Sequence, residues 1–249
     1  MLSTNINFQH IIVDSGDEMG KAAAERFVSE AGQLLQSKED INVIFAAAPS
    51  QHEFLRYLCM SGLDFSRINA FHMDEYIGLP IAAPQRFGNF LKAHLFDKVG
   101  FKSVHFINGN ASDSKAECTR YSDLLKQHPV DIVCMGIGEN GHLAFNDPPV
   151  ADFNDPFMVK VVELETACRI QQVNDGCFEN IAEVPTHAIT LTIPMLMSAG
   201  YISCVVPGER KAQAVYNTLY KEMISEYPST ILRSHKHTIL FTDRDSSNC

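Results

Sequence analysis

A strand-then-helix unit occupies residues 41–62, INVIFAAAPSQHEFLRYLCMSG. Its first eight residues are almost all apolar, which is typical of a strand covered on both faces. A turn of small residues containing Pro49 and Ser50 follows, and apolar residues then recur at helical spacing as far as Gly62. Because a strand that leads directly into a helix is the repeating unit of a parallel sheet, this stretch favours an α/β fold.

The same alternation continues along the 249-residue chain, which has no repeat, linker or low-complexity segment. Strands are predicted at 41–48, 67–73, 103–108, 131–136, 157–164, 187–193, 201–208 and 237–243. Helices are predicted from Ser15 to about Gln36 and at 49–62, 84–99, 114–128 and 209–220. We therefore predict one domain, residues 1–249, with an open, doubly wound, Rossmann-like fold: a mostly parallel sheet with helices on both faces.

The composition is that of an ordinary globular protein, and it limits the class of partner. Hydrophobic residues make up 45% of the chain and charged residues 20%. Acidic residues outnumber basic residues by 30 to 20, so the formal charge is −10. This charge argues against nucleic acid or an anionic membrane as the main partner, but it permits a small anionic ligand. The sequence permits a homo-oligomer without predicting one.

The cysteines indicate a reducing compartment. They lie at 59, 118, 134, 168, 177, 204 and 249, mostly in apolar stretches, and no two have Cys-x-x-Cys spacing. Buried, reduced thiols of a cytoplasmic protein explain this pattern best. Residues 1–17 lack the features of a signal peptide, and no apolar run approaches the ~20 residues of a membrane span. No Cys/His/Asp cluster has metal-ligand spacing, so we predict no metal site.

Polar side chains follow four of the predicted strands, at the point where each strand ends. They lie in the segments AAAPSQ (46–51), MDEY (73–76), GIGENGH (136–142) and VVPGERK (205–211). The carboxyl ends of parallel strands meet at one edge of a sheet, and ligands bind in the crevice there. We therefore expect the four segments to form one site.

The segment MDEY carries two adjacent acids. If the pleat of the strand continues, Asp74 and Glu75 point in opposite directions, so only one of them faces the crevice. A carboxylate in that position can act as a general base. The alternative is a turn acid that accepts backbone hydrogen bonds or caps a helix.

The segment GIGENGH combines a glycine turn with a histidine. Gly136 and Gly138 let a ligand approach the backbone closely, and His142 can move a proton near neutral pH. Asp147, five residues further on, can fix the tautomer of that histidine. The alternative is a structural glycine turn that holds a satisfied histidine.

The two remaining segments carry groups that can bind an anion. Lys211 lies in the first turn of a predicted helix, beside free N–H groups, where a phosphate would explain its position. Ser50 can offer its hydroxyl to a phosphate or cap the following helix. The alternatives are an exposed surface lysine and a plain helix cap.

Together, these segments resemble the glucosamine-6-phosphate deaminase (isomerase) family, which shares a superfamily with the 6-phosphogluconolactonases. The resemblance covers about residues 40–220 and rests on four strings: FHMDEYIGLP (71–80), GIGENGHLAFNDP (136–148), VPTHAITLTIPMLMSA (184–199) and VVPGERKAQAV (205–215). The lactonases usually have Thr-Ala-Ser after the Gly-His pair. This chain has Leu-Ala-Phe-Asn there, which favours the deaminase branch.

The resemblance implies an enzyme that isomerises glucosamine 6-phosphate, or a close epimer, and releases ammonia to give fructose 6-phosphate, with no metal or organic cofactor. Asp74 matches the carboxylate that moves a proton from C2 to C1, and His142 matches the imidazole that opens the sugar ring. Asn140 and Asp147 stand where the family has an Asp and a Glu that support the histidine. Because Asn140 carries no charge, we expect Asp147 to be the main partner of His142.

The phosphate site departs from the family pattern. Lys211 matches the phosphate-binding lysine and Ser50 the phosphate loop, but Pro49 has no N–H to donate. The family's phosphate-binding arginine has no clear counterpart, and we expect Arg86 or Arg169 to replace it. The predicted catalytic residues are thus Asp74, His142, Asp147 and Asn140, and the predicted substrate- and phosphate-binding residues are Ser50, Gly136, Gly138, Lys211, Arg86 and Arg169.

Two alternatives to the deaminase are kept. One is a 6-phosphogluconolactonase or another phosphosugar isomerase of the same fold. The other is a non-catalytic sugar-phosphate sensor. A small-molecule phosphosugar is the expected partner in every case.

Overall fold

The main sheet contains seven parallel strands within residues 7–248, the part of the chain that the computed structural model describes. Residues 1–6, the start of the segment considered for a signal peptide, and Cys249 lie outside it. The strand order is β1-β10-β9-β6-β2-β3-β5. The strands are β1 (Asn7–Val13), β2 (Ile41–Phe45), β3 (Ile68–His72), β5 (Ser103–His105), β6 (Ile132–Met135), β9 (Tyr201–Val206) and β10 (His237–Asp243). The predicted α/β fold with a mostly parallel sheet is confirmed.

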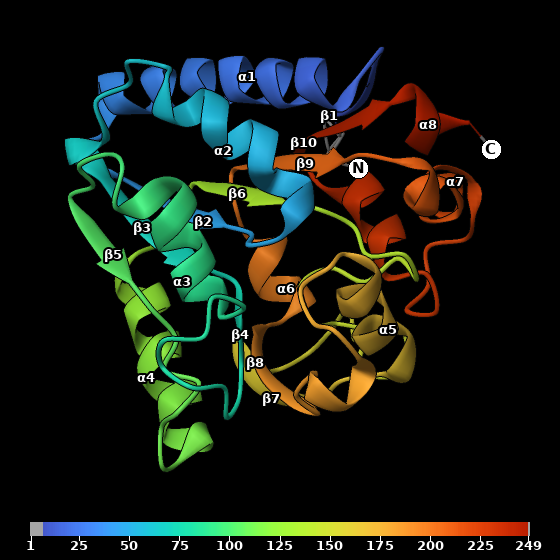
Figure 1. Cartoon of the computed structure of the whole chain (residues 1–249). Helices are drawn as coiled ribbons and strands as arrows, with labels where there is room; N and C mark the ends of the chain where they lie inside the picture. The colour runs from blue at the N-terminus through green and yellow to red at the C-terminus, as the bar shows by residue number, and fades with distance from the viewer. Residues whose placement is uncertain (1–6, 249) are drawn as a thin grey trace.

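Helices cover both faces of this sheet, as predicted (Figure 1). One face carries α1 (Gly16–Ser37), α2 (His52–Cys59) and α3 (Phe87–Leu91); the other carries α4 (Ser114–Gln127), α6 (Ile193–Leu196) and α7 (Ala212–Tyr220). The central strand β2 is buried on both sides, because Val43 and Phe45 pack with α1 and α2 while Ile44 packs with the helices opposite. This two-sided burial accounts for the continuous apolar run in the sequence.

Three of the predicted helices are interrupted. The segment 49–62 divides into a 3₁₀ turn, η1 (Pro49–Gln51), and α2. The segment 84–99 divides into α3 and a π-helical turn, η3 (Lys92–Phe96), and the segment 209–220 into η5 (Glu209–Lys211) and α7. The turns η1 and η5 lie shortly after the ends of β2 and β9. In these two segments the α-helix therefore starts further from the edge of the sheet.

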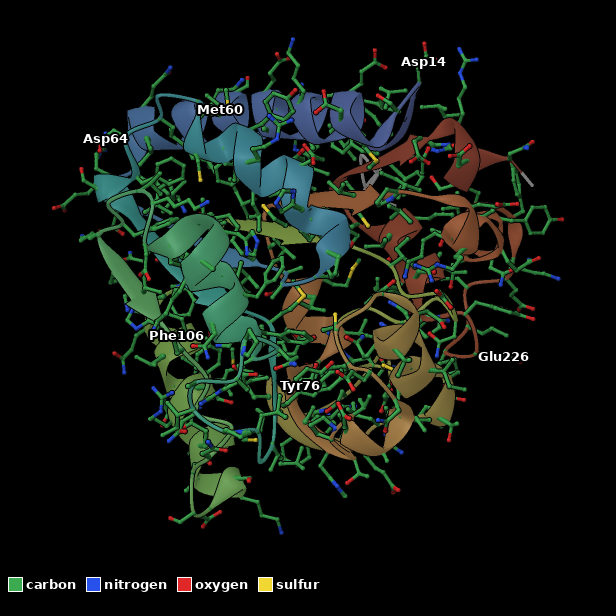
Figure 2. The ribbon with its side chains drawn as sticks, viewed as in Figure 1. Asp14, Met60, Asp64, Tyr76, Phe106 and Glu226 are labelled. Carbon is green, nitrogen blue, oxygen red and sulfur yellow. The ribbon has the colours of Figure 1, made fainter. Side chains whose placement is uncertain are left out.

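A second sheet of three antiparallel strands, β4-β8-β7, contains two of the predicted strands. Its members are β4 (Asp74–Tyr76), β7 (Val159–Glu163) and β8 (His187–Leu191). β7 is only partly buried, as expected for a sheet with one face toward solvent. Tyr76, which is labelled in Figure 2, anchors this sheet. Its ring lies 4.8 Å from that of Phe87 and 5.4 Å from that of Phe145, centroid to centroid.

The strand β1 and the helix α5 are the longest strand and the longest α-helix that were not predicted. β1 is a half-exposed edge strand whose polar residues Gln9 and His10 interrupt the apolar pattern. The helix α5 (Thr166–Asn174) buries Cys168, Gln171 and Gln172, so its inward face is largely polar and gives no apolar periodicity. Among the described helices, none has both the length and the apolar character needed to cross a bilayer. The six cysteines that the structure describes are all free.

The chain reverses its direction across the main sheet between β2 and β6. From β2 it moves outward to β3 and β5, and it then returns to the other side of β2 as β6 and continues to β9 and β10. Such a reversal opens a crevice at the carboxyl ends of the two central strands. The segments 46–51 and 136–142 follow β2 and β6 and therefore flank it.

Candidate active site

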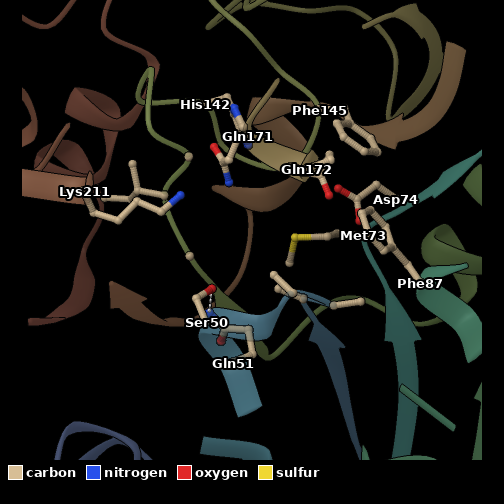
Figure 3. Close-up of a pocket in the computed structure, with 17 residues that line it drawn as sticks. Ser50, Gln51, Met73, Asp74, Phe87, His142, Phe145, Gln171, Gln172 and Lys211 are labelled. Carbon is tan, nitrogen blue, oxygen red and sulfur yellow. Dashed lines mark hydrogen bonds between the residues drawn. The ribbon is translucent and has the colours of Figure 1, made fainter. Parts of the chain in front are cut away.

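One pocket brings together the four polar segments that follow β2, β3, β6 and β9 (Figure 3). It is lined by Ser50 and Gln51 after β2, Asp74 after β3, Gly136, Gly138 and His142 after β6, and Lys211 after β9. The expectation that these segments meet at one site is confirmed. Figure 3 shows Lys211 at one end of the pocket and Asp74 at the other, with His142 between them.

The two acids of MDEY point in opposite directions, as the pleat predicts. Asp74 lines the pocket, whereas the carboxylate of Glu75 accepts hydrogen bonds from the backbone N–H groups of Phe87 and Gly88, each at 3.1 Å. Glu75 therefore fixes the start of α3, while Asp74 faces the pocket. Within residues 7–248, no hydrogen bond from another group satisfies the Asp74 side chain.

Burial perturbs Asp74 strongly. The side chain is only 6% exposed and lies beside Phe87 and Phe145, whose rings stack at 5.5 Å. Burial, with a further contribution from the charge of Glu75, raises the pKa of Asp74 well above its ordinary value. A raised pKa brings the proton affinity of a carboxylate closer to that needed for proton transfer near neutral pH.

His142 is held from behind by two residues. Its Nδ1 lies 2.8 Å from Asn140 Oδ1 and 3.0 Å from Asp147 Oδ1. The expectation that Asp147 would be the main partner is thus only half right, since the asparagine oxygen is the nearer of the two. Both residues lie behind the imidazole, and of these three residues His142 alone lines the pocket.

The orientation of Asn140 determines which nitrogen of His142 carries the proton. The Asn140 amide donates to Asp147 Oδ1 at 2.8 Å and to Glu165 Oε2 at 2.9 Å. Because both carboxylates take N–H groups of this amide, its oxygen must face His142 and accept a hydrogen bond from Nδ1. Nδ1 is then the protonated nitrogen, and Nε2 carries the lone pair.

The absence of a side chain at Gly138 leaves room for the imidazole ring of His142. A Cβ atom on Gly138 would lie 2.1 Å from Cε1 and 2.3 Å from Nδ1 of His142, which is well inside contact distance. The backbone N–H of Gly138 also donates to the carbonyl of His142 at 3.0 Å, which closes the turn. The glycine is therefore required by the close packing of the histidine ring.

Three buried side chains in the described part of the chain could in principle hold a metal ion: His142, Asp147 and Cys168, whose ligand atoms lie within 4.8 Å of one another. Burial, with the nearby charge of Asp147, raises the pKa of the Cys168 thiol well above its ordinary value, so the sulfur keeps its proton. Burial also acts to raise the pKa of Asp147, but hydrogen bonds from His142, Asn140 and Cys168 outweigh it and lower that pKa. Within residues 7–248, these side chains therefore form a hydrogen-bonded group around the Asp147 carboxylate.

Lys211 supplies positive charge at the other end of the pocket. It is 7% exposed, and within residues 7–248 its ammonium makes no hydrogen bond or ion pair. Burial lowers the pKa of Lys211, although the nearby carboxylates of Asp175 and Glu139 oppose that shift. An anion bound at this end would give the ammonium the partner that it lacks.

The two arginines expected at the phosphate site are not brought to the pocket. Arg86 Nε lies 3.6 Å from Glu75 Oε2, and the guanidinium of Arg169 donates to the carbonyls of Ile181 and Val184 at 2.7 and 2.9 Å. Both arginines therefore hold neighbouring loops in place. Lys211 is the only Lys or Arg among the described residues that line the pocket.

Comparison with known proteins shows the family of the chain. Residues 14–241 match the model of the family described as glucosamine-6-phosphate isomerases/6-phosphogluconolactonase. The chain belongs to this family. The glucosamine-6-phosphate deaminase of Bacillus cereus (strain B4264) is 34% identical over 236 residues, which cover 95% of this chain and 87% of that protein. The deaminase of Exiguobacterium sp. (strain ATCC BAA-1283 / AT1b) is 36% identical over 218 residues, covering 87% and 84%.

Solved structures of the glucosamine-6-phosphate isomerase/6-phosphogluconolactonase family share the fold. A monomeric glucosamine-6-phosphate deaminase of the NagB superfamily superimposes with a TM-score of 0.87 and 26% identity, covering 96% of this chain and 98% of that chain. The 6-phosphogluconolactonase of Thermotoga maritima superimposes with a TM-score of 0.78 over 96% of this chain and 100% of its own, at 18% identity. The second likeness concerns the fold alone.

Sequence reasoning missed part of this family member's site. Glu165, which accepts from Asn140, directly precedes α5, and Gln171 and Gln172 of that helix line the pocket. The available signal was the spacing of Cys168, Gln171 and Gln172, which places three polar side chains on one helical face. Without the helix assignment, that spacing had no evident meaning.

Proposed function

We propose that this chain is an amino-sugar-phosphate deaminase/isomerase that converts glucosamine 6-phosphate, or a close epimer, to fructose 6-phosphate and ammonia. The observation that carries the proposal is the pairing, in one pocket, of a buried carboxylate with a raised pKa, Asp74, and an oriented imidazole, His142. Lys211 at the far end gives the pocket a site for the phosphate. The deaminases of Bacillus cereus and Exiguobacterium sp. support this choice of reaction.

Binding would begin at the end of the pocket near Lys211. The buried ammonium has no partner in the described part of the chain, so a phosphate there would compensate its desolvation. Ser50 and Gly136 also line the pocket, so the Ser50 hydroxyl and the Gly136 backbone could form further hydrogen bonds with the substrate. The sugar carbons would then extend from Lys211 toward Asp74.

Ring opening is the step for which His142 is suited. With Nδ1–H held by Asn140 and Asp147, Nε2 can take the proton of the anomeric hydroxyl and return a proton to the ring oxygen. The carbon–oxygen bond of the ring breaks, and an aldehyde forms at C1. The imidazole ends the step in its starting protonation state.

Isomerisation is the step for which Asp74 is suited. The ionised carboxylate takes the proton from C2 and returns it to C1. A proton also passes from the amino group to the C1 oxygen, so the amino aldehyde becomes a C2 imine with a hydroxyl on C1. Water then adds to C2, and ammonia leaves as the ketone forms. A raised pKa makes Asp74 a stronger base than an ordinary carboxylate.

The alternatives differ from this proposal in what they require of Asp74. A 6-phosphogluconolactonase needs a water activated by His142 but no proton transfer from C2, and a sensor needs neither. Replacing Asp74 by Asn should therefore abolish a deaminase but spare a lactonase or a sensor.

The test is incubation with glucosamine 6-phosphate and with its galacto and manno epimers, following both ammonia and ketose phosphate. We expect equal amounts of the two products from one epimer, and no product from the Asp74→Asn variant. Hydrolysis of 6-phosphogluconolactone without ammonia release would favour the lactonase. Calorimetric binding of all three sugars with no turnover would favour the sensor.

A further inference from the structure

The inward face of α5 is polar, although it packs against the interior of the protein. Cys168, Gln171 and Gln172 follow one another at i, i+3 and i+4, and they are 1%, 6% and 7% exposed. A helix of this kind usually buries an apolar stripe, because a buried carboxamide without a hydrogen-bond partner destabilises the fold. The two glutamines therefore need partners in the interior.

The protein supplies those partners for Gln171 only. Gln171 Oε1 accepts from the backbone N–H of Glu139 at 2.8 Å, and its Nε2 donates to Asp175 Oδ2 at 3.3 Å. The side chain of Gln172, by contrast, makes no hydrogen bond within residues 7–248, although 93% of it is buried. Its carboxamide lines the pocket, where a bound ligand can complete its hydrogen bonding.

The free carboxamide lies at the reactive end of the pocket. Figure 3 shows the oxygen end of Gln172 and the carboxylate of Asp74 pointing toward one another, on the side away from Lys211. A carboxylate and a carboxamide that face each other both offer acceptor oxygens, which suits a group with several N–H donors between them. An amino group has these donors, whereas a hydroxyl has only one.

We propose that Gln172 determines specificity by binding the C2 amino group of the substrate, so that the pocket selects amino sugars over sugars with a hydroxyl at C2. The inference rests on the proposed function, because it is Asp74 that places C2 next to this carboxamide. The C2 substituent is bonded to the carbon that Asp74 deprotonates, so it lies within reach of both side chains. A site built around a hydrogen-bonding group discriminates strongly against a ligand that lacks it.

The test measures binding without turnover. Two open-chain phosphates serve as probes: 2-amino-2-deoxyhexitol 6-phosphate and the matching hexitol 6-phosphate, neither of which has a carbonyl group that could isomerise. Calorimetry on the whole protein should give about tenfold or greater preference for the amino probe. In Gln172→Met, which keeps the length of the side chain but removes both polar atoms, we expect this preference to fall markedly, since Asp74 then remains as the only acceptor of the pair.

The matched control is Gln171→Met, the same change at the neighbouring residue whose carboxamide is already bound by the protein. It should lower the thermal stability but keep the preference for the amino probe. If Gln172→Met does not fold, Gln172→Asn takes its place, since the shorter side chain withdraws the carboxamide from C2 and should also lower the preference markedly.

Two outcomes would overturn the inference: equal binding of the two probes by the wild-type protein, or an undiminished preference in a folded Gln172 variant. Failure of the proposed function is seen separately, as a lack of ammonia release from all three epimers. The binding experiment and the ammonia assay therefore give independent results, so failure of one proposal can be distinguished from failure of the other.

Discussion

The packing of His142 against Gly138 can be tested by the addition of one methyl group. In Gly138→Ala, the new Cβ would lie 2.1 Å from His142 Cε1, whereas ordinary contacts begin at 3.4 Å. The difference means that the ring or the backbone of the turn must move by roughly 1.3 Å to relieve the overlap. The ring has little freedom to move elsewhere, because the side chain is 11% exposed and hydrogen-bonded to Asn140.

The expected cost follows from the hydrogen bonds of His142. Its Nδ1 contacts of 2.8 Å to Asn140 and 3.0 Å to Asp147 would both exceed hydrogen-bond distance after a movement of that size away from them. A catalytic group misplaced by about 1 Å costs on the order of 100-fold in rate. We expect kcat/KM for glucosamine 6-phosphate to fall by about this factor, and the overpacking to lower the free energy of unfolding by about 1–3 kcal/mol.

The assay combines ammonia release with thermal unfolding followed by circular dichroism. The matched control is Gly32→Ala in α1, where an added Cβ meets nothing within 4 Å. It should keep full activity and gain up to about 1 kcal/mol of stability from helix propensity. If Gly138→Ala keeps half of the wild-type kcat/KM while folded, the account of how His142 is positioned is wrong.

Three further substitutions test the charges of the pocket. In Asp74→Asn, ammonia release should be lost, but thermal stability at pH 7 should rise. The pKa of Asp74 is higher in the folded state than in the unfolded state, so this carboxyl group destabilises the folded state at pH values above its ordinary pKa. That gain should vanish near pH 3, and an equal gain at both pH values would contradict the assignment. In Asn140→Asp, a third carboxylate meets Asp147 and Glu165, so the melting temperature should fall more at pH 8 than at pH 5; a fall that does not depend on pH would contradict this. Lys211→Met should raise KM for the sugar phosphate about tenfold or more with a smaller change in kcat, and an unchanged KM would exclude Lys211 as the phosphate ligand.

The meeting of the four segments could be predicted because it depends on local patterns. Continuous apolar runs indicate buried parallel strands, and parallel strands present their carboxyl ends at one edge. The opposite directions of Asp74 and Glu75 follow from the pleat alone. The edge strand β1 and the polar-faced helix α5 could not be predicted in this way, because neither has the apolar periodicity on which the prediction relies.

The places of Arg86 and Arg169 were harder to predict, because a long side chain can reach several partners. Arg86 and Arg169 are close in sequence to residues that line the pocket. Arg86 nevertheless pairs with Glu75, and Arg169 donates to the carbonyls of Ile181 and Val184. These partners are distant in the chain or belong to the backbone, so no residue pattern shows them. Lys211 could be predicted because its position at the start of a helix is itself unusual for a lysine.

Asn140 shows why a single substitution can be misread from the sequence alone. Next to Asp147, an asparagine in place of an acid looks like a loss of support for His142. The structure adds Glu165, which approaches the same amide from α5 at 2.9 Å. A carboxylate at position 140 would then face two others, whereas the amide donates to both and still presents its oxygen to His142 at 2.8 Å. Asn140 therefore fixes the tautomer of the imidazole without adding a third negative charge, and Glu165 is the reason that an amide suits this position better than an acid.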